Sequence, residues 1–147
     1  MLRKVKSFTL VELIIVVIIV GILASLGLTQ YSAVVEKSRL AEAKVRIGTM
    51  KQLAYEYYLN NGVMTAATDA DMGVNNTCSS TDFYSYWICC GYTDFVYLWA
   101  TRCTSGGKSP NTSRAYRFGV RYHPGTDQIV WHCQYTNDAS SCFGLPP

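Results

Sequence analysis

One carboxylate, that of Glu12, lies inside an otherwise apolar run near the start of the chain. Between Phe8 and Leu28, 16 of the 21 residues are apolar, and Glu12 carries the only charge. A carboxylate costs about 2.5–3.5 kcal/mol at the centre of a membrane and less near its surface. Two interpretations are therefore open: Glu12 reaches the lipid headgroups, or it meets a specific partner group in apolar surroundings.

Six cysteines form the second group of residues with chemical potential, and all of them follow residue 77. They are Cys78, Cys89, Cys90, Cys103, Cys133 and Cys142. This distribution is typical of a disulfide-bonded domain in an oxidising compartment. A metal site is the alternative, but the sequence contains no C-x-x-C pair, and the adjacent Cys89 and Cys90 are poorly spaced for zinc. The sequence therefore favours structural disulfides.

The remaining polar residues do not form a recognisable catalytic pattern. His123 and His132 flank an expected turn, and Asp69 and Asp71 lack the rest of a calcium-binding motif. No Ser/His/Asp order, phosphate-binding loop or paired-carboxylate cluster stands out. The sequence therefore predicts no catalytic residue, no metal site and no cofactor, and hence a protein that is not an enzyme.

The charge distribution orients the apolar run. Arg3, Lys4 and Lys6 precede it without any acidic residue among them, and the remaining 10 basic and 10 acidic residues balance. By the positive-inside rule the N-terminus lies in the cytoplasm and the chain after Leu28 lies outside. A cleaved secretory signal is the alternative, but the run is longer than the usual signal core and no clean A-x-A site follows it.

Helical periodicity continues beyond the apolar run. An apolar stripe at three- and four-residue spacing consists of Leu40, Ala43, Ile47, Met50, Ala54 and Tyr57, and Leu53 widens it. No proline interrupts residues 8–61, and Asn60-Asn61-Gly62 is a stop signal. The pattern predicts one helix of about 54 residues, followed by a long polar loop from Val63 to Thr81.

After this loop the apolar period changes to two. Strands are predicted over residues 95–100, 116–122 and 129–135, with a turn at residues 123–127, and residues 83–88 are a weaker candidate. Three or four antiparallel strands over one amphipathic helix make an α+β fold.

The N-terminal residues resemble a known family signature. The run Lys6-Ser7-Phe8-Thr9-Leu10-Val11-Glu12-Leu13-Ile14-Ile15-Val16-Val17, with Gly21-Ile22-Leu23-Ala24 and Thr29-Gln30-Tyr31 after it, is similar to the cleavage and methylation signature of type IV prepilins. The resemblance implies cleavage between Ser7 and Phe8 by a prepilin peptidase and N-methylation of Phe8. It also implies a leader at 1–7, a transmembrane and filament-core helix at 8–29, and a head at 30–147 that includes the C-terminal half of the helix.

The family signature includes an acidic residue four positions after the first residue of the mature chain, and Glu12 occupies that position. The new amine of Phe8 in one subunit would pair with Glu12 of an incoming subunit, which makes docking register-specific. The resemblance thus implies a major pilin: a structural homo-oligomer, held in the inner membrane as a precursor and polymerised by the pilus assembly machinery into an extracellular filament. Adhesion, twitching motility and DNA uptake are all compatible with it.

Two alternative functions share the signature. One is a type II secretion pseudopilin, which the cysteine-rich head disfavours. The other is a minor pilin or tethered binding module that contacts DNA or a surface. A basic patch would serve this second role, and its candidate members are Arg102, Lys108, Arg114, Arg117 and Arg121.

The resemblance also assigns one disulfide. The spacing of Cys133 and Cys142 is similar to the C-terminal disulfide loop of many pilins. Of the four cysteines that remain, adjacent ones rarely bridge each other. We therefore expect Cys89 and Cys90 to pair with Cys78 and Cys103, in either order.

Overall fold

The computed structural model describes residues 9–112 and 115–135, apart from the side chains of residues 28–30, 32, 33 and 135. One helix, α1 (Leu10–Asn61), is followed by four strands. The chain divides into two compact units, Met1–Lys37 and Ser38–Pro147, and α1 contributes to both. Within the described residues, the predicted single long helix is confirmed.

The described part of the first unit is apolar helix. Its stretch Leu10–Gly27 has a mean hydropathy of 2.8 and is long enough to cross a membrane. Side chains all around this stretch are exposed, so it has no apolar face covered by the rest of the chain. Lipid or other protein must cover it in a stable state.

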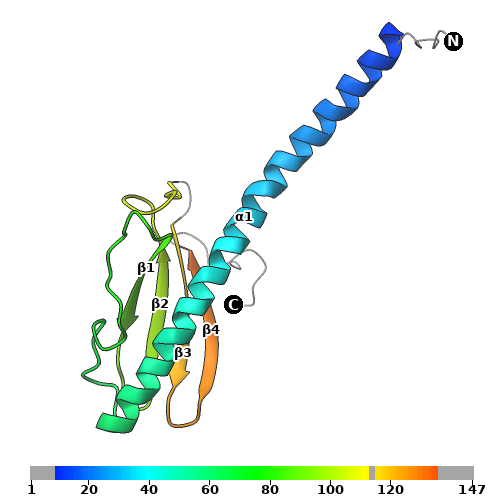
Figure 1. Cartoon of the computed structure of the whole chain (residues 1–147). Helices are drawn as coiled ribbons and strands as arrows, with labels where there is room; N and C mark the ends of the chain where they lie inside the picture. The colour runs from blue at the N-terminus through cyan, green and yellow to red at the C-terminus, as the bar shows by residue number, and fades with distance from the viewer. Residues whose placement is uncertain (1–8, 113–114, 136–147) are drawn as a thin grey trace, which may run out of the picture. The chain divides into compact units, whose positions relative to one another are not determined.

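The second unit is a sheet with one helix on it (Figure 1). Its strands are β1 (Tyr84–Cys89), β2 (Val96–Arg102), β3 (Tyr116–His123) and β4 (Gln128–Tyr135). They lie in the order β1-β2-β3-β4, and all neighbours are antiparallel. The α+β fold is confirmed, including the weaker strand candidate, which forms β1.

The core forms between α1 and one face of the sheet. The predicted stripe is confirmed: Leu40, Ala43, Ile47, Met50 and Ala54 are buried, while Leu53 and Tyr57 are partly buried. Alternate strand residues meet the stripe because side chains in a strand point to opposite faces. These strand residues are Tyr84, Tyr86, Val96, Leu98, Ala100, Tyr116, Phe118, Val120, Tyr122 and Cys133.

The loop between α1 and β1 covers the outer edge of β1. The backbone amide of Ile88 donates to Oδ1 of Asp69 at 2.7 Å, and that of Tyr86 donates to the carbonyl of Asn75 at 3.3 Å. The loop also buries Met64 and Met72 in the core. This edge strand is therefore protected from pairing with another chain.

Candidate functional site

The first turn of α1 holds the Glu12 carboxylate in place. Its Oε2 atom accepts hydrogen bonds from the backbone amide of Thr9 at 2.9 Å and from the Thr9 hydroxyl at 2.7 Å. In return, the Glu12 amide donates to Oγ1 of Thr9 at 3.2 Å. This reciprocal arrangement is a capping box, which satisfies amides that have no partner inside the helix.

Sequence analysis missed the role of Thr9, although its T-x-x-E spacing to Glu12 is the known signal for such a box. A negative charge in the first turn is also favourable toward the helix dipole. The two predicted processing residues, Ser7 and Phe8, lie outside the described residues. Their proximity to Glu12 stays a prediction.

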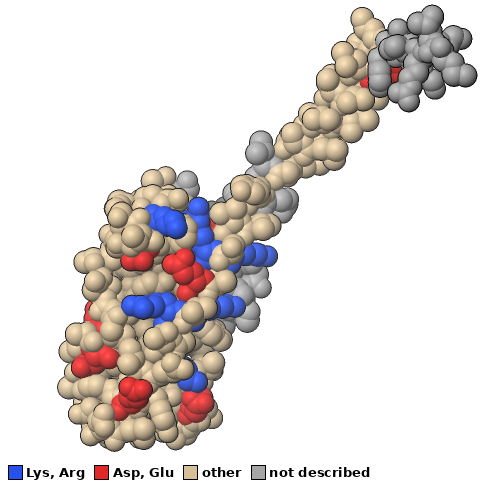
Figure 2. All heavy atoms as spheres, in the orientation of Figure 1, with Lys and Arg blue, Asp and Glu red and all other residues tan. Residues whose placement is uncertain are grey.

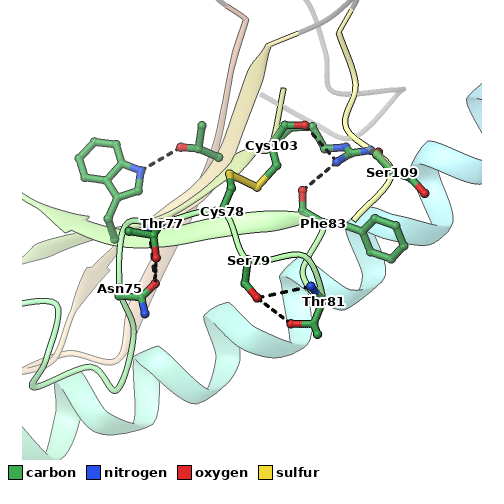
Figure 3. The surroundings of a disulfide bond; sticks show 11 residues. Asn75, Thr77, Cys78, Ser79, Thr81, Phe83, Cys103 and Ser109 are labelled. Carbon is green, nitrogen blue, oxygen red and sulfur yellow. Dashed lines mark hydrogen bonds between the residues drawn. A yellow bond between two sulfur atoms is a disulfide. The ribbon is translucent and has the colours of Figure 1, made fainter. Parts of the chain in front are cut away.

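The cysteine pairing differs from the expectation. Cys78 is bonded to Cys103, and Cys89 is bonded to Cys90 (Figure 3 shows the first bond). Cys133 is also disulfide-bonded. Its expected partner, Cys142, lies outside the described residues, so that pairing stays a prediction.

The register of the first two strands explains why the expected pairing is wrong. Tyr84 pairs with Arg102 at one end of the β1–β2 ladder, and Cys89 pairs with Tyr97 at the other. These ends are about 17 Å apart at 3.4 Å per residue. Cys78 and Cys103 flank the first end, so Cys89 at the second end is beyond the 7 Å that a disulfide can span between Cα atoms.

A buried arginine organises the loop around the Cys78–Cys103 bond. Arg102 is only 1% exposed, and its guanidinium donates to the carbonyls of Phe83 at 2.8 Å, Ser109 at 2.6 Å and Cys103 at 3.3 Å. Figure 3 shows Phe83 and Ser109 beside the disulfide. The guanidinium also lies 5.6 Å from the ring centroids of Phe83 and Tyr84. Arg102 therefore has a structural role and is not available to a surface patch.

The other described members of the expected basic patch lie in two different places: Lys108 is near Arg102 at the Phe83 ring, and Arg117 and Arg121 are on the outer face of the sheet. Nζ of Lys108 lies 4.9 Å from the centroid of the Phe83 ring. Arg114 is outside the described residues. Arg117 and Arg121 lie over aromatic rings on the face of the sheet that points away from α1. On the face of the head that Figure 2 presents, basic and acidic side chains are mixed.

The acids and histidines considered above have local structural contacts. Asp71 accepts hydrogen bonds from the amide of Thr68 at 2.8 Å and from its hydroxyl at 2.7 Å, which lowers the pKa of Asp71. Asp69 binds the β1 amide described above. His123 is at the end of β3, and its Nδ1 atom lies 3.8 Å from Oδ2 of Asp94. Within the part of the chain that the structure describes, no three His, Cys, Asp or Glu residues are grouped to hold a metal ion.

A hollow of about 730 Å³ lies between the head portion of α1 and the loop that follows α1. Its charged lining is mixed, with Glu42 and Asp82 opposing Arg46, whose guanidinium donates to the Gly73 carbonyl at 2.9 Å. Burial and the nearby Glu42 raise the pKa of Tyr86 in its wall. The two carboxylates and one guanidinium leave the lining with a formal charge of −1, and the two signs are mixed, so the hollow has no concentrated charge that selects a ligand.

Comparison with known proteins points to one family. The prokaryotic N-terminal methylation motif matches residues 2–28. The chain is similar to the fimbrial protein EcpC of Eikenella corrodens, with 31% identity over 147 residues, 97% of this chain and 94% of that protein. It is also similar to a probable minor fimbrial protein of Dichelobacter nodosus (40% identity over 70 residues; 48% and 43% of the two chains).

A third similar protein is the type IV major pilin protein PilE of Neisseria gonorrhoeae, with 43% identity over 58 residues, which are 40% of this chain and 35% of that protein. No solved structure is significantly similar to this chain. The match to the methylation motif covers the capping box and the exposed apolar helix described above.

Proposed function

Because this chain belongs to the type IV pilin family, we propose that it is a major structural subunit of a pilus. It is made as a membrane-anchored precursor and polymerises through its N-terminal helix. Its relatives carry pilin and fimbrial names, which favours a pilus over a secretion pseudopilus. The role is structural rather than enzymatic, and adhesion, motility and DNA uptake are functions that such a filament can serve.

The proposal assigns a step to each segment. A prepilin peptidase removes residues 1–7 by cutting between Ser7 and Phe8, and Phe8 is then N-methylated. Residues 8–29 anchor the precursor in the inner membrane and later form the filament core. Residues 30–147 form the head, with Cys133 and Cys142 closing a loop at its C-terminal end.

The observation that carries this function is Glu12 in the first turn of an exposed apolar helix. Both hydrogen bonds from Thr9 end on Oε2, so among the described residues Oε1 is the oxygen left to accept from an incoming group. The amine of Phe8 in a neighbouring subunit is a partner of the opposite charge. Pairing removes two uncompensated charges from apolar surroundings and makes one register of helix packing favourable.

We expect Glu12→Gln and Glu12→Ala to insert into the membrane normally but to yield roughly tenfold fewer filaments or worse. An unpaired charge in an apolar interior costs about 3–5 kcal/mol, which leaves the Phe8 amine without compensation. Filaments are quantified by electron microscopy and immunoblot of sheared surface material, and insertion by membrane fractionation. Glu56→Gln, which removes an exposed charge from the head portion of α1, is the matched control.

Two results would contradict the proposal. One is a wild-type filament yield from both Glu12 variants. The other is mass spectrometry showing that the native protein keeps Met1 through Ser7 and never polymerises.

A minor pilin is the second candidate, favoured by the similarity to a probable minor fimbrial protein. Immunogold labelling separates the two roles. Label along the whole filament supports a major pilin, whereas label confined to rare positions supports a minor one.

A further inference from the structure

The disulfide between the adjacent residues Cys89 and Cys90 lies where β1 ends. Cys90 is exposed and Cys89 is half-buried, so solvent reaches the bond from the Cys90 side. The Cys78–Cys103 bond differs, because Cys103 is only 1% exposed and Cys78 is half-buried. Attack by a thiolate on Cys78 would leave a charged sulfur on the buried Cys103, which is unfavourable. A thiol in solution should therefore react first with the bond at the end of β1.

The Cys89–Cys90 bond also contributes little to holding the fold together. Its sequence separation is 1, whereas that of the Cys78–Cys103 bond is 25. A disulfide stabilises a protein mainly by closing a loop in the unfolded chain, and adjacent residues close almost none. Opening this bond therefore leaves the rest of the head folded.

The backbone at Cys90 is in a conformation that residues with a side chain seldom adopt. Its φ is 55°, in the left-handed region that favours glycine. Such a conformation persists only where the surroundings hold it, and the bond to Cys89 is one such restraint. When that bond opens, Cys90 can return to an ordinary backbone conformation.

The conformation of Cys90 directs the connection between β1 and β2 onto the loop that follows α1. Gly91 comes next, and a Cβ there would collide with the Met64 carbonyl, so the two backbones lie in close contact. The Met64 amide donates to the Tyr92 carbonyl at 3.2 Å, and the Tyr92 amide donates to the Phe95 carbonyl at 2.9 Å. Met64 is itself buried in the core. A change at Cys90 is therefore transmitted directly to the contact with Met64.

We propose that the Cys89–Cys90 bond is a reversible thiol–disulfide exchange site, whose substrates are dithiols in the surrounding solution. One thiolate of the dithiol attacks Sγ of Cys90, which forms a mixed disulfide and releases the Cys89 thiolate to take up a proton from water. The second thiolate of the dithiol then displaces Sγ of Cys90. The dithiol is thereby oxidised to a disulfide, and both cysteines are reduced to thiols.

Reduction at this site loosens the contact between the β1–β2 connection and the loop that follows α1. Oxidation of the two thiols by a disulfide compound restores that contact. The site is separate from polymerisation, since neither cysteine belongs to the apolar stretch of α1. The alternative is a bond that is purely structural, and its near-zero loop closure and its exposure disfavour this role.

The first test measures reduction of the full chain in a non-ionic detergent without denaturant. Dithiothreitol is the reductant, the thiols are trapped with iodoacetamide at timed intervals, and mass spectrometry of peptides locates them. We expect labelling of Cys89 and Cys90 to be at least tenfold faster than labelling of Cys78 and Cys103. Oxidised glutathione, added after removal of dithiothreitol, should return the first pair to the unlabelled state.

Hydrogen exchange tests the structural consequence. After selective reduction, the Met64 amide should exchange about fivefold faster, because Cys90 leaves its left-handed conformation more often. Amides in the middle of β3 should exchange at an unchanged rate. The matched control is the double variant Cys89→Ser/Cys90→Ser, in which the Met64 amide should exchange at the faster rate without reductant and should not respond to dithiothreitol.

Four results would overturn the proposal. They are equal labelling rates for the two disulfides, no labelling of Cys89 and Cys90 without denaturant, labelling of this pair before any reductant is added, and an unchanged exchange rate of the Met64 amide after reduction. The wild-type chain alone decides all four, so the proposal remains testable should the double variant fail to fold. None of these measurements depends on filament assembly, which separates this test from that of Glu12.

Discussion

His132 illustrates how burial tunes a single residue. It lies on β4 with its ring 5.9 Å from that of Tyr97 and 6.3 Å from that of Trp99. Within the described residues, its Nε2 atom is buried without a hydrogen-bond partner, as is Nε of Arg121. Desolvation, and then the positive charge of Arg121, lower the pKa of His132 below its ordinary value of 6.5.

The lowered pKa predicts an acid-sensitive fold. Below pH 6.5 the unfolded chain binds a proton at this histidine more readily than the folded chain, so stability rises with pH across this window and falls on acidification. Between pH 6.5 and the lowered pKa of His132, the urea concentration at the unfolding midpoint should fall on acidification. We expect His132→Gln to reduce this pH dependence.

A proton NMR titration measures the His132 pKa directly. In the folded protein its midpoint should lie below 6.5, and Arg121→Gln should raise it by removing the nearby charge. A midpoint at or above 6.5 in the wild-type protein would contradict the prediction.

At the level of elements, periodicity in the sequence was sufficient for most of the fold. The stripe from Leu40 to Ala54 predicts both the helix and its buried face, because helix contacts repeat every three to four residues. Alternation in β3 and β4 likewise predicts strands, and the turn at residues 123–127 sets their pairing. These patterns are local, so they can be read without knowing the tertiary structure.

The sequence was insufficient where distant segments meet. The Cys78–Cys103 pairing depends on the register of β1 with β2, and β1 was the least certain strand. The burial of Arg102 was also not predictable, because the carbonyls that bind it come from Phe83 and Ser109, on separate loops. For the candidate assembly site, the family signature indicates Glu12. The contact of Glu12 with Thr9 is indicated by a different signal, the T-x-x-E spacing of a capping box.

The two disulfides with both cysteines among the described residues should contribute very differently to stability. The Cys78–Cys103 bond closes a loop with a sequence separation of 25, whereas Cys89 and Cys90 are adjacent. Because a disulfide stabilises mainly by restricting the unfolded chain, the first should be worth about 3 kcal/mol and the second well under 1 kcal/mol. Urea unfolding of the double variants Cys78→Ala/Cys103→Ala and Cys89→Ala/Cys90→Ala measures the difference.

The two double variants are controls for each other, since each removes two sulfur atoms from the head. An equal loss of unfolding free energy in both would contradict the loop-closure argument. A mass increment showing intermolecular disulfides in the wild-type protein would contradict the pairing itself.

At the level of the whole molecule, the two compact units differ in the surroundings that they require. The whole chain has a mean hydropathy of +0.07, although Leu10–Gly27 alone averages 2.8, so the remainder is on average hydrophilic. The side chains of that stretch are exposed, and none of them belongs to the head core. The head therefore does not need this stretch to fold.

We accordingly expect a chain that lacks residues 1–27 to be soluble in water and to keep its sheet. In a detergent phase-separation experiment the shortened chain should enter the aqueous phase, whereas the full chain and its Glu12→Gln variant should enter the detergent phase. Far-UV circular dichroism reports whether the shortened chain keeps the sheet of the full chain. A hydrophilic unit with a complete core is expected to stay in water. Aggregation of the shortened chain, or its partition into the detergent phase, would therefore mean that the head needs the apolar stretch in order to fold.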